Sequence, residues 1–141
     1  MQYNGAYIIG QINKLTNRKI NELLKERNVT EFNAAQGIIL YVLEDQKKMT
    51  IKDICQATGL AKTSLTSMLD RMEKQGLIVK EDDEEDQRCT LVSLSEKSCR
   101  YKKTIEEVAQ IISEEYYVGM SRSEIAYFED TLNRILRNLQ E

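Results

Sequence analysis

The 141-residue sequence contains no histidine and no proline, and each absence excludes a kind of site or segment. Without histidine, the chain has no imidazole for acid–base catalysis, for a Ser-His-Asp or Cys-His nucleophile, or for a His-ligated metal. Without proline, it has no Pro-rich linker, and long uninterrupted helices are favoured. The composition therefore points away from most enzymes, and we expect no catalytic residue, no metal site and no cofactor.

Long apolar runs and disulfide patterns are also missing from the sequence. No run of about 18 apolar residues occurs, so we expect no membrane span and no membrane partner. The amino terminus, Met1–Gly5, lacks the basic stretch and the apolar run of a signal peptide. The cysteines, Cys55, Cys89 and Cys99, are sparse, odd in number and without a CxxC pair, unlike a secreted disulfide framework. These features favour a cytoplasmic location.

Charge is slightly negative overall, with 20 basic residues against 23 acidic ones. This balance, with a pI of about 5.2, excludes a histone-like or polybasic nucleic-acid coat. Six of the carboxylates are consecutive, at positions 81–86, and outside that run residues 50–95 hold six basic residues and three acidic ones. The low pI therefore conceals a modest basic face in the middle of the chain.

Apolar periodicity predicts two helices in the first third of the sequence. Residues 7–27 carry apolar groups at helical spacing. Thr30 is positioned to cap a second helix, with Asn33 three residues on. Lys47 and Lys48 would follow near the carboxyl end of this helix, where cations complement the helix dipole. Its apolar stripe would comprise Phe32, Ala35, Ile38, Ile39, Val42 and Leu43.

Shorter elements with the dimensions of a helix-turn-helix come next. A strand stub at 49–51 leads into a short helix, which Thr50 would cap together with Asp53. Gly59 would break this helix, because glycine adopts the left-handed turn conformation without strain. A second helix is predicted from about Lys62 to Gln75, ended by the glycine that follows it.

The outer face of that second helix carries small hydroxyls and one cation. Such side chains can hydrogen-bond phosphates and base edges without steric bulk. An ordinary helical hairpin with a polar outer face has the same periodicity, so residues 50–76 alone leave both interpretations open. The candidate contact residues are Lys62, Thr63, Ser64, Thr66 and Ser67.

A hairpin and two long helices complete the pattern. Segments 77–80 and 90–94 have high β propensity and flank the polar segment 81–89. Ser95 would cap a long helix with Ile105, Val108, Ile111 and Ile112 on its apolar side. The residues from Ser121 to Glu124 form a capping box for the last helix. That helix has a coiled-coil-like seam, wider than one small domain needs, at Ile125, Phe128, Leu132, Ile135 and Leu139.

A helix-turn-helix followed directly by a two-stranded hairpin is a winged helix, which favours the DNA-binding interpretation. The segment 60–78 resembles the recognition helix of MarR-type regulators. Residues 83–88, and then 92–97, resemble the wing of that family and the helix start after it. The expected fold class is mainly α (α+β), a winged helix-turn-helix with long N- and C-terminal dimerisation helices.

The resemblance implies a homodimer that binds duplex DNA at a pseudo-palindromic operator and acts as a ligand-responsive repressor of transcription. Residues 1–30 and 96–141 would form the helical dimerisation region, and residues 31–95 the DNA-binding lobe. The outer face of the second helix, from Lys62 to Ser67, would read base edges in the major groove. A two-fold dimer spaces two such helices by about one turn of DNA.

The resemblance also assigns roles outside that face. Arg88 would be the wing cation that enters the minor groove, and Asp86 would orient its guanidinium through a charge-assisted bond. Arg71 and Lys74 would meet phosphates. Three positions depart from the family pattern, which has a capping Ser, a second wing cation and a Gly where this chain has Ala61, Gln87 and Ser98.

A small effector is a further implication, because the family often binds anionic aromatic compounds between the dimer helices and the DNA-binding lobe. Tyr3, Tyr7 and Tyr41 lie on the elements that would line such a crevice. Plain packing with a solvated hydroxyl is the commoner role for tyrosines in such positions, and it stays open here.

The cysteines allow a redox interpretation as a lesser alternative. Relatives that sense oxidants carry their reactive thiol in the first helix, and residues 1–54 contain no cysteine. Cys55 falls where a helix-turn-helix needs a small buried residue, so we predict core packing for it. Cys89 and Cys99 are the candidate thiol switches, since a sensor needs both thiolate character and access.

Two functions of other classes remain as alternatives. A winged-helix protein-interaction module without specific DNA binding would use the same fold, with the acidic wing as its contact surface. An enzyme is the weaker alternative, because no activated nucleophile and no cluster of perturbed bases is visible in the sequence.

Overall fold

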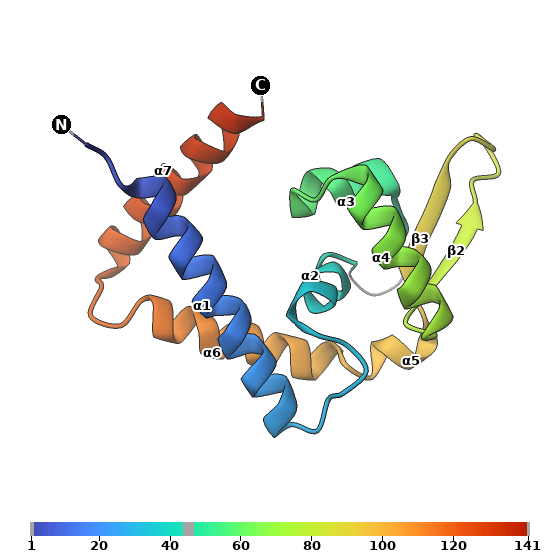
Figure 1. Ribbon diagram of the computed structural model, residues 1–141, viewed down its shortest axis with the longest axis horizontal. Coiled ribbons are helices and arrows are strands. Elements are labelled where there is room, and N and C mark those ends of the chain that lie inside the picture. The colour runs from blue at the N-terminus through green and yellow to red at the C-terminus, as the bar shows by residue number, and fades with distance from the viewer. Residues whose placement is uncertain (1, 44–46, 141) are drawn as a thin grey trace. The chain divides into compact units, whose positions relative to one another are not determined.

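The computed structural model describes residues 2–43 and 47–140. Within these ranges the protein is mainly helical with a small antiparallel sheet, as predicted (Figure 1). Its compact units are Met1–Ala109 and Gln110–Glu141, and the division falls within a helix. The elements in chain order are α1 (Gly5–Glu26), α2 (Ala34–Val42), β1 (Met49–Thr50), α3 (Ile51–Thr58), α4 (Lys62–Lys74), β2 (Ile78–Asp82), β3 (Thr90–Leu94), α5 (Glu96–Cys99), α6 (Lys102–Tyr116) and α7 (Arg122–Leu139).

The core of the first unit lies between α2, α3, α4 and the sheet. The α4 helix packs against α3 and β2, α2 packs against α3, and β3 contributes the buried Val92 from the sheet. Burial of such side chains stabilises the fold by roughly 1.5–3 kcal/mol each. The side chains that are at most 1% exposed are Ile39, Leu43, Ile54, Leu65, Leu69, Met72, Leu77, Val92 and Ser98.

The sheet has the strand order β1-β3-β2, so β3 is its central strand. Val92 faces Met49 on one side and Lys80 on the other in an antiparallel register. The β2 strand continues through Asp82, which pairs with Thr90, so the loop comprises residues 83–89. The prediction of a polar loop starting at 81 was therefore wrong by two residues, because partners on β3 extend the ladder.

Local signals placed the helix-turn-helix correctly. The Thr50 hydroxyl accepts the Asp53 N–H at 3.1 Å and caps α3. Gly59 ends α3 with a left-handed φ of 74°, a conformation that strains residues with a Cβ. Gly76 plays the same part after α4, with φ 77°.

The predicted start of the second helix was wrong. Asn33, and not Thr30, caps α2: its side chain accepts the Gln36 N–H at 3.0 Å, and the Gln36 side chain accepts the Asn33 N–H at 3.2 Å. Phe32 therefore precedes the helix, and its buried ring packs edge-on against Tyr101 with centroids 5.1 Å apart. Of the predicted stripe, Ala35 and Ile38 are exposed.

One of the two lysines predicted to complement the end of this helix, Lys48, has a different setting. The α2 helix ends at Val42, and residues 44–46 lie outside the described ranges. The Lys48 ammonium lies 2.5 Å from the Glu81 carboxylate on β2. Lys48 thus pairs with a carboxylate of the wing rather than with the α2 carbonyls.

The single long helix predicted after Ser95 is also wrong, because the chain forms two helices. Ser95 caps the short α5 by accepting the Ser98 N–H at 3.1 Å. Arg100 and Tyr101 then donate to carbonyls three residues earlier, which is the tighter spacing of a 3₁₀ turn. This turn separates α5 from α6 and brings Tyr101 against the buried Phe32 ring.

The second unit contains the end of α6 and all of α7. The predicted capping box is confirmed, because Ser121 and Glu124 each bond the other's backbone N–H, at 3.1 and 2.7 Å. The Tyr117 hydroxyl donates to Glu129 at 2.7 Å, and this bond raises the pKa of Tyr117 to about 12. No α7 side chain is buried in the described chain, and Leu139 is 79% exposed.

None of the described helices is long and apolar enough to cross a membrane.

Candidate nucleic-acid interface

The α4 helix has a buried face and a polar face, and the first positions the second. Leu65, Leu69 and Met72 are fully buried and fix the rotation of the helix. Four of the five predicted contact side chains, at Lys62, Thr63, Ser64 and Ser67, are exposed on the opposite face. A helix packed in this way presents its first two turns to solvent at a fixed angle.

Thr66 differs from the other predicted contact residues. It is half-buried, and its hydroxyl donates to the Lys62 carbonyl at 2.8 Å. Its one hydroxyl hydrogen is therefore committed to the helix backbone, and only the oxygen lone pairs stay available. The prediction that Thr66 lies outward with its neighbours is corrected to this half-buried position.

The two ends of α4 differ, because the N-cap lacks a side-chain bond and the last turn carries two cations. Ala61 occupies the N-cap and offers no side-chain bond, as its residue type implies. Arg71 and Lys74 are exposed in the last turn, where cations complement the helix dipole. The helical rise places Lys74 about 18 Å from Lys62 along the axis, so the two ends contact different parts of any long ligand.

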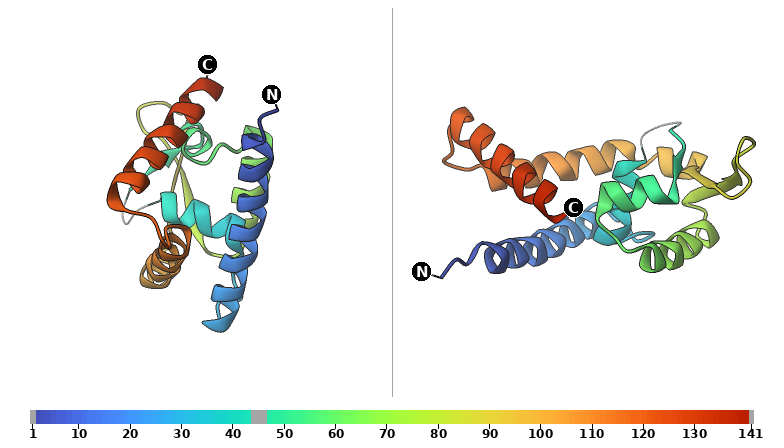
Figure 2. Two further views of the ribbon diagram at one scale, coloured as in Figure 1. Left: turned by 90° about the vertical axis from the view of Figure 1, so that its left-hand side faces the viewer. Right: turned by 90° about the horizontal axis from the view of Figure 1, so that it is seen from above.

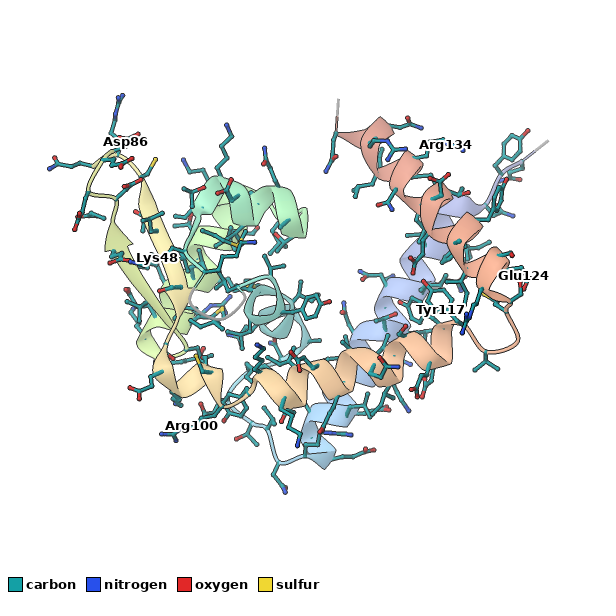
Figure 3. All side chains as sticks on the ribbon, turned by 180° about the vertical axis from the view of Figure 1, so that it is seen from behind. Lys48, Asp86, Arg100, Tyr117, Glu124 and Arg134 are labelled. Atoms are coloured by element: carbon teal, nitrogen blue, oxygen red, sulfur yellow. The ribbon has the colours of Figure 1, made fainter. Side chains whose placement is uncertain are left out.

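The wing is the β2–β3 hairpin, and its loop extends away from the sheet beside α4 (Figures 1 and 2). Backbone bonds close the loop: the Asp83 N–H donates to Cys89 O at 3.0 Å, and the Cys89 N–H to Asp86 O at 2.9 Å. Figure 3 shows Asp86 at the loop end. The loop therefore has a defined conformation although it is polar.

Asp86 and Arg88 meet in this loop. The Asp86 carboxylate accepts the Arg88 N–H at 3.1 Å and lies 3.6 Å from Arg88 Nε. The Arg88 side chain is 95% exposed, so the pair orients the guanidinium without burying it. The structure thus brings together the two residues that the resemblance joined, while their roles stay a prediction.

The acidic run of the wing is partly engaged within the described chain. Glu81 pairs with Lys48, and the Asp83 carboxylate accepts the Glu85 N–H at 3.0 Å. The side chains of Glu84 and Glu85 are exposed at the loop. The wing therefore combines one oriented cation with carboxylates that are in part neutralised or turned back to the backbone.

The cysteines are all free, and their settings differ. The Cys89 thiol donates to the Asp86 carboxylate at 3.5 Å, and this bond, with burial, raises its pKa. A raised pKa reduces the thiolate fraction, which argues against Cys89 as an oxidant sensor. Cys99 is exposed at the end of α5. Cys55 is half-buried, so the prediction of full core packing is corrected.

Two ion pairs on β2 were missed in the sequence. Lys80 binds the Asp70 carboxylate on α4, and Glu81 binds Lys48, which directly precedes β1 (labelled in Figure 3). The hydrogen bond from Lys80 lowers the pKa of Asp70, and the bond to Glu81 raises the pKa of Lys48. Strand alternation around 78–82 was the available signal, because it puts residues 80 and 81 on opposite faces.

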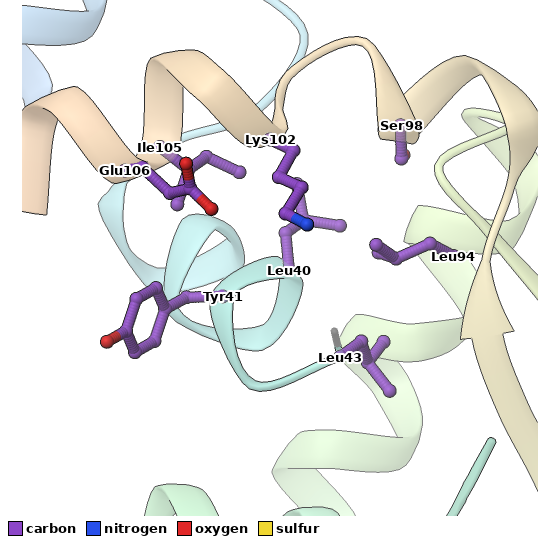
Figure 4. A pocket seen from close by; sticks show the side chains of 8 residues that line it. All are labelled: Leu40, Tyr41, Leu43, Leu94, Ser98, Lys102, Ile105 and Glu106. Atoms are coloured by element: carbon purple, nitrogen blue, oxygen red, sulfur yellow. The ribbon is translucent and has the colours of Figure 1, made fainter. Parts of the chain in front are cut away.

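A cavity of about 430 Å³ lies in the first unit, away from the outer face of α4. Figure 4 shows Tyr41 and Glu106 at one side, Ser98 at the other, and Lys102 between them. Of the three predicted effector-contact tyrosines, only Tyr41 lines it; Tyr3 and Tyr7 are exposed elsewhere. Its walls come from α2, β3, α5 and α6, at Leu40, Tyr41, Leu43, Leu94, Ser98, Lys102, Ile105 and Glu106.

Ser98 joins the cavity wall to the end of α4. Its hydroxyl is buried and donates to the Leu77 carbonyl at 2.5 Å, and the Ser95 N–H donates to the same oxygen at 3.1 Å. Leu77 follows directly on the turn that ends α4. The departure from the family's glycine therefore supplies a hydrogen bond between α5 and the segment after α4.

A short helix, a glycine turn, a second helix with a polar outer face and an antiparallel hairpin beside it define a winged helix-turn-helix protein. The sequence of residues 31–88 matches the family model described as MarR family. The winged helix of this chain thus matches the MarR family, as the resemblance in the sequence predicted. The curated relatives that it matches are named transcriptional regulators rather than enzymes.

Two curated relatives of this chain are named as transcriptional regulators. The chain is 24% identical to the HTH-type transcriptional regulator SarZ of Staphylococcus epidermidis. It is 28% identical to the organic hydroperoxide resistance transcriptional regulator of Bacillus subtilis. Each alignment covers 88% of this chain and 81% of the relative.

The fold is shared with a mutant of MarR from E. coli, solved in complex with operator DNA. The TM-score is 0.78 at 23% identity, over 93% of this chain and 92% of that one. At this identity the likeness establishes the fold alone.

Proposed function

We propose that this chain is a sequence-specific, double-stranded-DNA-binding transcriptional regulator that acts as a homodimer on a pseudo-palindromic operator, as a ligand-responsive repressor. The observation that carries the proposal is the pairing of two exposed elements. The hydroxyl-rich start of α4 and the guanidinium of Arg88 both face solvent, on elements that pack against each other. Such a protein acts where the DNA is, in the cytoplasm.

The start of α4 suits the major groove. B-DNA admits an α-helix there, and each base pair presents a distinct pattern of donors and acceptors. Thr63, Ser64 and Ser67 offer hydroxyls that donate and accept, and Lys62 adds one cation. Arg71 and Lys74, further along the same helix, would bind phosphates and set the register rather than read sequence.

Arg88 suits the minor groove beside it. Narrow A·T tracts concentrate negative potential there and attract inserted arginines. The Asp86 carboxylate, 3.6 Å from Arg88 Nε, would orient the guanidinium toward the minor groove. This contact would favour A·T-rich flanks without reading single bases.

A homodimer is supported by apolar side chains that the described chain leaves exposed. On α1, Ile8, Ile12 and Leu15 are exposed, the last by 58%. On α7, Ile135 and Leu139 are exposed, in the seam found in the sequence. Residues 1–30 and 96–141 would form the dimerisation region, and residues 31–95 the lobe that binds DNA.

The effector site would be the cavity beside Tyr41. Its lining combines an aromatic hydroxyl and the Lys102 ammonium with apolar walls, which suits an anionic aromatic compound, although Glu106 opposes an anion on one side. A ligand there would shift the population between dimer geometries that fit and do not fit the operator. Repression follows where the operator overlaps a promoter, since the bound dimer excludes polymerase.

Selection of bound duplexes from a random pool, followed by titration at several salt concentrations, tests the proposal. We expect one enriched pseudo-palindrome, bound saturably, with affinity that falls steeply as salt rises. The Arg88→Ala variant should bind it more weakly, and the slope against salt should fall by about one.

The protein-interaction module is the competing function, and the same selection separates it. A pool that shows no enrichment, with weak binding to every duplex, would leave the regulator proposal without support. Light scattering that reports a monomer would independently exclude the dimer.

A further inference from the structure

The β2 strand forms an ion pair on each of its two faces. On one face, the Lys80 ammonium binds the Asp70 carboxylate of the recognition helix α4. On the other, the Glu81 carboxylate lies 2.5 Å from the Lys48 ammonium, just before β1. These residues are adjacent on β2, and none of the four was assigned a role in DNA contact.

The register of the sheet explains why the two pairs lie on opposite faces. Residues directly opposite each other in an antiparallel ladder share a face. Lys80 is opposite Val92, which is fully buried, so Lys80 points to the inner face and toward α4. Its side chain is only 18% exposed. Glu81 is opposite Leu91, whose other partner is Thr50, so it points to the outer face.

The outer pair crosses the central strand. Lys48 precedes Met49, which pairs with Val92, and Glu81 belongs to β2, which pairs with the other edge of β3. The Lys48–Glu81 contact therefore ties the two edge strands together over β3. The Asp70–Lys80 contact ties one of those edge strands to the recognition helix.

We propose that Asp70–Lys80 and Lys48–Glu81 are positioning pairs that fix the angle of the wing against α4 and so aim Arg88 at the minor groove beside the bases that α4 reads. The inference rests on the proposed DNA-binding function. In this proposal the role of orienting the wing belongs to Asp70, Lys80, Lys48 and Glu81. Arg88 and the outer face of α4 contact the DNA.

Electrostatics alone makes the opposite prediction for the two carboxylates, so the direction of the change in DNA affinity distinguishes the two explanations. Asp70 and Glu81 are anions on elements that approach DNA, so removing either charge should strengthen binding if charge alone matters. If the pairs position the wing, removing either charge should weaken binding. The loss should be concentrated in the preference that Arg88 provides for A·T flanks.

Four single variants of the 141-residue chain separate the two accounts. Asp70→Asn and Glu81→Gln each remove one charge of a pair with little change of shape. Glu73→Gln on α4 and Glu85→Gln in the wing loop remove the same charge at exposed sites for which the described part of the chain records no ion pair. Circular dichroism and urea unfolding establish that each variant is folded.

The first readout, amide hydrogen exchange over residues 78–94, needs no DNA. We expect faster exchange in the hairpin for Asp70→Asn and Glu81→Gln, and unchanged exchange for Glu73→Gln and Glu85→Gln. The second readout is the ratio of Kd values for the selected duplex with G·C and with A·T flanks. For either pair variant, this Kd ratio should be about threefold lower than in wild type, and so closer to the ratio measured for Arg88→Ala.

The charge swap, Asp70→Lys with Lys80→Asp, keeps the net charge and restores a pair of reversed polarity, and should recover most of the flank preference. Wild-type-like exchange and flank ratios in both pair variants would overturn the inference while leaving DNA binding intact. If wild type enriches no duplex, the proposed function fails, and hydrogen exchange still decides whether the pairs hold the wing. Should Asp70→Asn fail to fold, Glu81→Gln decides alone, because its pair lies on the surface.

Discussion

The recognition helix and the wing are adjacent and are held in place by different forces. The helix α4 is anchored by Leu65, Leu69 and Met72, all fully buried, so its rotation is fixed by apolar burial. The wing is anchored at its base by the buried Ile78 and Val92, but residues 79–91 include no buried side chain, and there the ladder, loop hydrogen bonds and two ion pairs hold it. The helix is therefore positioned by a force that salt hardly affects, and the outer part of the wing in part by one that salt screens.

This contrast predicts the largest effect for a cavity in the anchor of the helix. Leu69→Ala should lower the free energy of unfolding by about 2–5 kcal/mol, because the lost burial is joined by the cost of the cavity. Val79→Ala, on the exposed side of β2, is the matched control and should cost about 0.5 kcal/mol or less. Urea unfolding measures both, and similar losses for the two variants would contradict the contrast.

The buried hydroxyl behind α4 should give an effect of intermediate size. Ser98→Ala removes a hydrogen bond to the Leu77 carbonyl and should destabilise the chain by about 1 kcal/mol. The Leu77 oxygen keeps the Ser95 N–H, which limits the loss. Ser67→Ala, at an exposed position of α4, should not lower the midpoint of urea unfolding and should raise it slightly, because alanine is the better helix former. Equal midpoints for Ser98→Ala and wild type would show that this bond contributes nothing net.

Because the start of α4 lacks a side-chain cap, a substitution there can stabilise the folded chain. Ala61 has the extended backbone of an N-cap but provides no side-chain bond. Ala61→Ser should therefore raise the free energy of unfolding by about 1 kcal/mol. Ala57→Ser, at an exposed position inside α3, is the control and should lower it slightly, because serine is the poorer helix former. Thermal unfolding followed by circular dichroism tests the pair, and a lower midpoint for Ala61→Ser would refute the capping argument.

The smallest expected effect is a pH dependence in the attachment of the wing. Lys80 lowers the pKa of Asp70 below its ordinary value of 3.8 in the folded state. The stabilisation is thus fully present above the pKa of the unfolded chain, and it is lost as pH falls through the lowered value, beginning at about pH 5. The stability difference between wild type and Asp70→Asn should shrink over that range. A difference that stays constant in urea titrations from pH 7 to pH 4 and below would argue against a folded-state shift.

Sequence reasoning found the elements whose signals are local. Thr50, Gly59 and the Ser121–Glu124 box act within four residues of themselves, so their patterns are readable in one pass. The inward face of α4 was equally readable, because three buried side chains recur at helical spacing. The remaining positions of α4 could then be assigned to its outer face. Thr66 is the exception, because it is half-buried and its hydroxyl bonds its own helix backbone.

The errors lie where distant parts of the chain decide local structure. Asn33 rather than Thr30 caps α2, and the turn at Arg100 that divides the predicted long helix brings Tyr101 against Phe32, far away in the sequence. The ion pairs of β2 join residues that share no repeating pattern. Only a known register places Lys48 across β3 from Glu81.

The most direct test of the proposed two-element contact is a hydroxyl-radical footprint on the selected duplex, for wild type and Arg88→Ala. The account predicts two protected half-sites about 10 base pairs apart, each with protected minor-groove sugars at its outer flank. In Arg88→Ala the flank protection should disappear while the half-sites stay protected at saturating protein. A footprint that Arg88→Ala leaves unchanged, or one without two-fold symmetry, would contradict the account.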